Sequence, residues 1–156
     1  MSAADPGDVS ASSAEQALSL TVRRTIRAAA ERVFAAWTQP GRLMDWWGPE
    51  PITCPSAEVD LRVGGRYRIA NRYSNGTMIW IVGEFERVEP PHVLIYSWSL
   101  EPGPPMSSRV TVQFEPRSED VTEVIVFHER LPDAALRDMH EQGWAGCLEG
   151  LAVYLE

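Results

Sequence analysis

Cysteine is scarce in this chain of 156 residues, which contains only Cys54 and Cys147, far apart in the sequence. Two distant cysteines do not make the disulfide framework that small secreted domains use. No apolar run approaches the ~18 to 20 residues that span a bilayer, and residues 1–18 have neither the basic start nor the apolar stretch of a secretory signal. We therefore expect a cytoplasmic protein that does not insert into membranes.

The motifs of metal, nucleotide and serine chemistry are missing too. A His-Glu pair occurs twice, but the position four residues after the histidine, where a zinc protease has its second histidine, holds Trp144 in one case and Pro132 in the other. There is no Gly-x-Ser-x-Gly elbow, phosphate-binding loop or dinucleotide fingerprint. We expect no metal site and no cofactor, and we interpret Cys147 as a small packing residue.

Basic residues are outnumbered, since 14 Lys and Arg against 22 Asp and Glu give a formal net charge of −8. Nucleic acids are bound by clustered Lys and Arg, whereas the arginines here are scattered along predicted strands. Arg66, Arg68 and Arg72 are interpreted as a solvated face. We expect no nucleic-acid partner, and a small apolar or weakly polar molecule, or another protein, fits this charge better.

Short alternating patterns fill most of the chain and predict a single α+β domain. Residues 1–17, rich in Ser, Ala, Asp and Gly, are predicted to be a flexible tail before a domain over 18–156. Leu20, Val22 and Ile26 alternate with polar residues in the first predicted strand. Turn residues then separate six further predicted strands, which are 56–62, 66–73, 78–88, 93–100, 108–115 and 121–130.

Three segments have helical spacing instead. Residues 29–38 and 42–46 predict two short helices, with Pro40 and Gly41 between them. The third and longest helix has Asp133 as its predicted N-cap. Its apolar stripe recurs every three or four residues and consists of Leu136, His140, Trp144, Leu148, Leu151 and Leu155.

A sheet is the only large surface available to that stripe. The sequence therefore predicts a seven-stranded, curved antiparallel sheet around a long C-terminal helix, with two short helices after the first strand.

Six motifs occur in a characteristic order: 34–40 (FAAWTQP), 45–49 (DWWGP), 62–67 (RVGGRY), 83–88 (GEFERV), 96–98 (YSW) and 140–144 (HEQGW). Together they resemble the bacterial relatives of the activator of the heat shock protein 90 ATPase, over about residues 20–156. The resemblance implies the helix-grip fold of START domains, the major birch-pollen allergen and polyketide cyclases. In that superfamily the space between sheet and helix often holds a hydrophobic ligand.

The resemblance does not imply one activity, because the superfamily includes carriers, hormone receptors, cyclases and co-chaperone domains. The eukaryotic co-chaperone carries an additional domain for its partner, and this chain has no room for one. We therefore do not expect activation of that ATPase.

Aromatic side chains supply the predicted ligand site. Six tryptophans are generous for this length, and indole and phenol rings combine apolar area with a hydrogen-bonding tip. The same rings could also be plain core packing. The predicted ligand-binding residues are Trp37, Trp46, Trp47, Tyr67, Ile69, Ile81, Phe85, Tyr96, Trp98, Val112, Phe114, Val126, His128, His140, Trp144 and Leu148.

His128 and His140 are the polar candidates within this cavity. His128 continues the inward-facing positions of the last strand, and His140 lies one turn before Trp144 on the helix stripe. An imidazole could transfer a proton near neutral pH. Each could instead hydrogen-bond a neighbouring group and fix the junction of strand and helix.

Three functional hypotheses follow. The leading one is binding of a hydrophobic or aromatic small molecule. The second is an enzyme of the cyclase or dehydratase type that uses His128 or His140 as acid–base groups. The third is an interaction module or chaperone helper in stress response, acting as a homodimer through a sheet edge or the region of Trp80.

Overall fold

The computed structural model describes residues 18–103 and 107–156. The predicted tail over 1–17, and residues 104–106 of the loop before the sixth strand, lie outside these ranges. The elements, in chain order, are β1 (Leu20–Ile26), α2 (Ala30–Thr38), α3 (Pro40–Trp46), β2 (Ala57–Val59), β3 (Arg66–Arg72), β4 (Met78–Glu89), β5 (Val93–Glu101), β6 (Ser108–Ser118), β7 (Val121–Glu129) and α4 (Ala134–Leu155).

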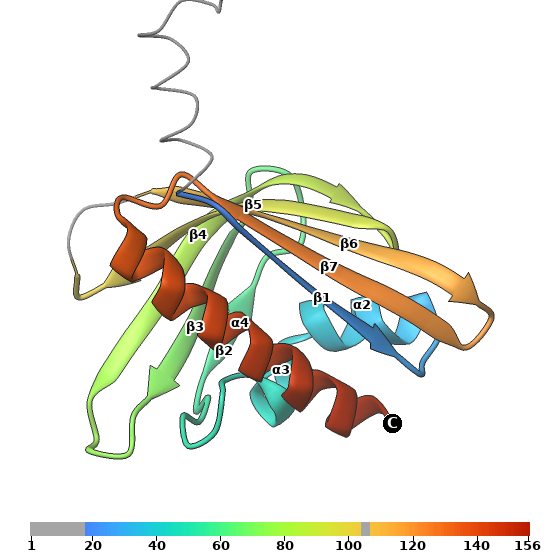
Figure 1. The fold of residues 1–156 in the computed structure, drawn as a ribbon, viewed down its shortest axis with the longest axis horizontal. Coiled ribbons are helices and arrows are strands. Elements are labelled where there is room, and N and C mark those ends of the chain that lie inside the picture. Colours follow the sequence, from blue (N-terminus) through green and yellow to red (C-terminus); the bar gives the residue numbers. More distant parts are fainter. Residues whose placement is uncertain (1–17, 104–106) are drawn as a thin grey trace, which may run out of the picture.

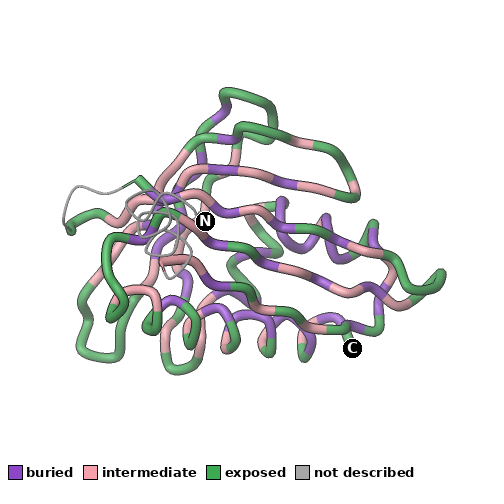
Figure 2. Tube along the Cα trace, turned by 45° about the horizontal axis from the view of Figure 1, so that its top comes forward, coloured by how far each residue is buried: buried purple, intermediate pink, exposed green. Residues whose placement is uncertain are grey.

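All seven strands pair antiparallel in one sheet of order β1-β7-β6-β5-β4-β3-β2. Buried positions recur along the strands (Figure 2) because successive side chains point to opposite faces of the sheet. In β7, for example, Thr122, Val124, Val126 and His128 are buried on one face. Figure 1 shows a strongly twisted sheet with α4 lying across one side of it. The predicted α+β helix-grip architecture is confirmed.

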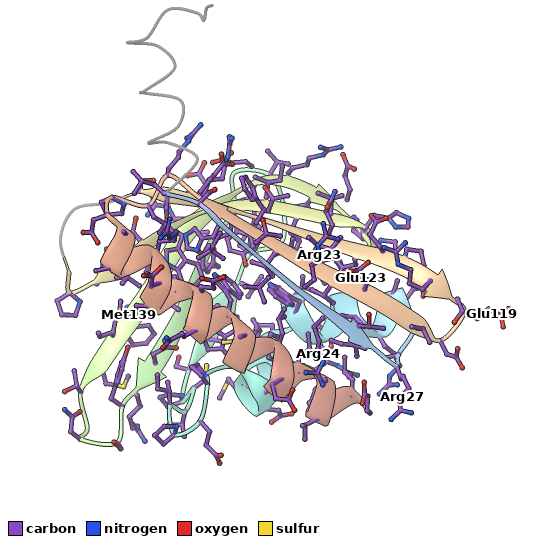
Figure 3. The ribbon with its side chains drawn as sticks, in the orientation of Figure 1. Arg23, Arg24, Arg27, Glu119, Glu123 and Met139 are labelled. Atoms are coloured by element: carbon purple, nitrogen blue, oxygen red, sulfur yellow. The ribbon has the colours of Figure 1, made fainter. Side chains whose placement is uncertain are left out.

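The long helix α4 closes over the buried face of the sheet. Its N-cap is Asp133, as predicted, because this side chain accepts a 2.8 Å hydrogen bond from the backbone N–H of Leu136. Near the other end, Arg24 of β1 forms an ion pair with Glu149, and Figure 3 shows Arg24 beside the helix. The C-terminal half of α4 is thus held against β1.

The short helices α2 and α3 fill the space under that half of α4. Phe34 and Trp37 of α2 both contact the ring of Phe114 in β6, with centroids 5.3 and 5.7 Å apart. Trp37 also stacks on Trp144 of α4 at 5.9 Å and 13° between ring planes. This end of the molecule is therefore densely packed with aromatic side chains.

Three predicted boundaries differ from the structure by more than one residue. The second short helix begins at Pro40 rather than at residue 42, because the fixed φ of proline suits the first helical position. The strand predicted over 56–62 extends only over Ala57–Val59, since the backbone then turns, with Gly64 at a φ of 85°. The strand predicted to end before Pro116 continues to Ser118 through a register shift.

Candidate functional site

A cavity of about 420 Å³ lies between the N-terminal half of α4 and strands β3, β4 and β5. The chain after α3 closes one side of it through Trp47, Pro49 and Ile52. Met139, labelled in Figure 3, is 56 % exposed and marks the mouth together with Tyr73. The full lining is Trp47, Pro49, Ile52, Asn71, Tyr73, Ile79, Ile81, Trp98, Leu100, Met139, His140, Gln142, Gly143, Trp144 and Cys147.

Three buried indoles, from the C-cap of α3, from β5 and from α4, form the inner wall of the cavity. Trp47 meets Trp144 edge to face at a centroid distance of 5.7 Å. Trp98 of β5 lies 5.2 Å from Trp144 and 6.4 Å from Trp47. Aromatic contacts of this kind are favourable beyond their buried area, so each ring holds the orientation of the next.

The indole N–H groups of Trp98 and Trp144 are bound to the two predicted histidines. Trp98 Nε1–H donates to His140 Nε2 at 3.2 Å, and Trp144 Nε1–H donates to His128 Nδ1 at 3.1 Å. Because an indole only donates, both of these imidazole nitrogens must be acceptors. The tautomer of each histidine is fixed by its tryptophan.

The opposite ring nitrogens must then carry the protons. His140 Nδ1–H donates to the carbonyl oxygen of Leu136 at 2.9 Å, and His128 Nε2–H donates to Ser108 Oγ at 2.7 Å. The Ser108 hydroxyl in turn donates a hydrogen bond to the carbonyl oxygen of Trp98 at 3.2 Å. Every polar atom of this buried chain is satisfied, which is the condition for keeping it in a core.

Burial sets the charge of the two imidazoles. It lowers the pKa of His128 to about 3, with repulsion from His140 as a smaller cause. The pKa of His140 is also lowered, mainly by burial, against the opposing hydrogen bond to Leu136. Both rings are neutral at pH 7. His140 lines the cavity, whereas His128 lies one layer deeper, with its ring 5.1 Å from that of Trp98.

The remaining indole of the wall is held by an amide. Trp47 Nε1–H donates to Oδ1 of Asn71 on β3 at 2.9 Å. Asn71 is half-buried and lines the cavity. Among the lining residues that the structure describes, none is Asp, Glu, Lys or Arg, so the cavity has polar groups but no fixed charge.

The predicted ligand-binding residues fall into three groups. Those that line the large cavity are Trp47, Ile81, Trp98, His140 and Trp144. A second group lines a space of about 20 Å³, which has room for little more than one water molecule. This group is Trp37, Tyr67, Ile69, Phe85 and Tyr96. Those that line neither and pack in the core are Trp46, Val112, Phe114, Val126, His128 and Leu148.

Sequence reasoning missed ten lining residues. Asn71, Ile79 and Leu100 had a signal, because each continues the inward alternation of a strand that already supplied a predicted site residue. Gly143 and Met139 lie on α4 near the predicted His140, but neither belongs to the apolar stripe from which the site residues of this helix were predicted. Pro49 and Ile52 lie in a loop without periodicity, and no local pattern indicates where such a loop packs. The others are Tyr73, Gln142 and Cys147.

The cysteines behave as packing residues. Burial raises the pKa of Cys147 to about 12 and also raises that of Cys54, so both are thiols at pH 7. Over residues 18–103 and 107–156, no group of three or more His, Cys, Asp or Glu is arranged to hold a metal ion. In the same ranges no helix combines the length and apolarity needed to cross a membrane.

A twisted seven-stranded sheet closed by a long C-terminal helix, with a cavity between them, is the architecture of helix-grip domains, a class whose fold supports ligand binding in general. Residues 27–156 match the family described as Activator of Hsp90 ATPase homolog 1-like protein, and the chain belongs to this family.

Solved structures of bacterial proteins show the same fold. Protein CV1439 from Chromobacterium violaceum has a TM-score of 0.80 at 26% identity, covering 88% of this chain and 97% of its own. The AHSA1 (SPO3351) protein from Silicibacter pomeroyi has a TM-score of 0.77 at 27% identity, covering 88% of this chain and 96% of its own. No curated protein sequence matches this chain.

Proposed function

We propose that this domain binds a small hydrophobic molecule in the cavity between α4 and strands β3–β5. The observation that carries the proposal is the cavity itself, about 420 Å³ in volume with an inner wall of Trp47, Trp98 and Trp144. Small-molecule sites typically have volumes of roughly 300–1,000 Å³, with mostly apolar walls and a few placed polar groups. The size and the lining of this cavity both fit that description.

Binding fits the site better than acid–base catalysis by His128 or His140. All four ring nitrogens of these residues are engaged in hydrogen bonds within the protein. A catalytic imidazole must give a nitrogen to its substrate, and here that would leave an indole N–H, a hydroxyl or a carbonyl unpaired in the core. We infer that the histidines orient the tryptophan wall instead.

The interaction-module hypothesis has weaker support. Trp80 lies on the face of the sheet away from α4, and the guanidinium of Arg68 covers its ring at 4.1 Å from the centroid. Among the residues that the structure describes, the two most exposed large apolar side chains are Val63, which lies in a turn, and Val153, which lies on α4. Single exposed apolar residues are normal on protein surfaces. The homodimer and the cytoplasmic location stay predictions.

Gly143 offers a direct test. It lies on α4 in the lining, and a Cβ placed on it meets nothing within 4 Å. Gly143→Leu should therefore add its side chain to the lining and reduce the cavity volume without distorting the backbone, and Gly143→Ala is the matched control that leaves most of the space open. The probe is 2-ethylnaphthalene, followed by a panel of neutral apolar compounds up to steroid size, with thermal unfolding as the readout.

A true ligand at a hundred times its Kd should stabilise the wild type and Gly143→Ala by about 2.7 kcal/mol. Gly143→Leu should show a smaller stabilisation, most clearly with the largest compounds of the panel, because less of the cavity is left for them. If no compound of the panel stabilises the wild type, or if the leucine variant responds like the alanine variant, the cavity is not a binding site and the proposal is wrong.

A further inference from the structure

The Asn71 side chain has a fixed orientation in the cavity. Its Oδ1 accepts the Trp47 indole N–H at 2.9 Å, and an indole cannot accept, so the amide oxygen must face Trp47. The Nδ2 group therefore points away from that bond, and no described residue accepts a hydrogen bond from it. Asn71 shares the inward face of β3 with Tyr67 and Ile69, both buried. Its amide presents two N–H donors at the cavity wall.

The other polar groups of the inner wall are already in use. The N–H groups of Trp47, Trp98 and Trp144 all donate to protein acceptors. His140 uses both ring nitrogens, and burial keeps the Cys147 thiol protonated by raising its pKa. The remaining polar lining side chains, Tyr73 and Gln142, are exposed at the mouth. Among the described side chains of the inner cavity, Asn71 is therefore the one that offers a ligand an unused strong polar group, and that group is a donor.

We propose that the cavity selects uncharged aromatic compounds with a carbonyl-type oxygen, which Asn71 binds through Nδ2. This inference rests on the proposed function and specifies its ligand. Three indoles favour a flat ring, since rings stack on aromatic walls in offset or edge-to-face contacts. An amide N–H favours an acceptor. No Lys or Arg lines the described cavity, so an ionised carboxylate would enter it without a counter-charge, which is costly.

Three probes of similar size test the preference for an acceptor and the exclusion of charge separately. They are 2-acetylnaphthalene, which is neutral and has an acceptor; 2-ethylnaphthalene, which has no acceptor; and 2-naphthoate, which is ionised at pH 7.5. Their Kd values are measured by calorimetry on the wild type and on Asn71→Asp. The aspartate keeps an oxygen for the Trp47 N–H and, when ionised, has no N–H to donate. Because it also adds a negative charge, the readout is the ratio of the Kd values for the ketone and for 2-ethylnaphthalene within the same variant.

We expect the ketone to bind the wild type about 3- to 10-fold more tightly than 2-ethylnaphthalene, the effect of one net hydrogen bond. Asn71→Asp should abolish that preference, and 2-naphthoate should bind at least about tenfold more weakly than the ketone. If ketone and hydrocarbon bind the wild type equally, or if naphthoate binds best, the inference is wrong while the binding function stands. If none of the three binds, both fail. The wild-type comparison decides the matter even where the variant does not fold.

Discussion

Replacing His128 by Gln tests the buried chain of indoles and imidazoles. The neutral His128 ring accepts from Trp144 through Nδ1 and donates to Ser108 through Nε2. A glutamine amide also has one accepting and one donating end, so it can serve both partners without titrating. His128 has no exposed surface, and its partners leave no place for a second ring proton.

The expected effect of pH follows from the pKa of His128, which burial lowers from the ordinary 6.5 to about 3. Because the folded-state pKa is the lower one, the unfolded chain binds the proton more tightly. The stability is therefore complete above pH 6.5 and is lost as the pH falls from there toward 3. At 1.36 kcal/mol per pKa unit, this one residue should cost about 2 kcal/mol of unfolding free energy between pH 7 and pH 5.

Urea unfolding followed by far-UV circular dichroism at several values between pH 7 and pH 5 measures this dependence. The wild type should lose stability more steeply than His128→Gln, by about 2 kcal/mol over the interval, with the same m-value at each pH. His92→Gln, at an exposed turn before β5, is the control for exchanging a histidine. If wild type and His128→Gln lose stability in parallel, His128 is not the buried neutral group described above.

Three further predictions concern local packing and capping. Gly146→Ala should lower the unfolding free energy by about 1–3 kcal/mol, because its Cβ would lie 2.5 Å from Cβ of Pro49. Gly143→Ala, whose Cβ meets nothing within 4 Å, should instead raise it by about 1 kcal/mol. Thermal unfolding compares the two variants. Gly83→Ala should cost at least about 2 kcal/mol in urea unfolding, since its Cβ would lie 2.0 Å from a backbone oxygen of β5. Asp133→Ala should lose the α4 N-cap and about 1 kcal/mol, and hydrogen exchange should rise in the first turn of the helix.

The architecture could be predicted because each element carries its own local signal. Alternation at Leu20, Val22 and Ile26 depends on the pleat of a strand and needs no knowledge of its partners. The cap at Asp133 and the turn at Gly76, whose φ is 89°, follow from backbone chemistry over a few residues. Such signals survive in a single sequence, and the structure confirms them.

The extent of the cavity could not be predicted, because alternation assigns a residue to a face but not to a place along it. Tyr96 and Trp98 are both inward on β5, yet only Trp98 lines the large cavity. The difference arises from Trp37 of α2, whose indole N–H donates a 3.4 Å hydrogen bond to the hydroxyl of Tyr96. How deeply a helix fills a groove depends on contacts between distant segments, and a single sequence does not reveal these.

The distribution of the tryptophans has a practical consequence for spectroscopy. Trp47, Trp98 and Trp144 line the cavity, whereas Trp37 and Trp46 are buried in the core and Trp80 lies on the opposite face of the sheet. Three of the six tryptophans thus border the cavity that is proposed to bind a small molecule. Their fluorescence should therefore change when a ligand enters the cavity, so that binding can be followed without a label.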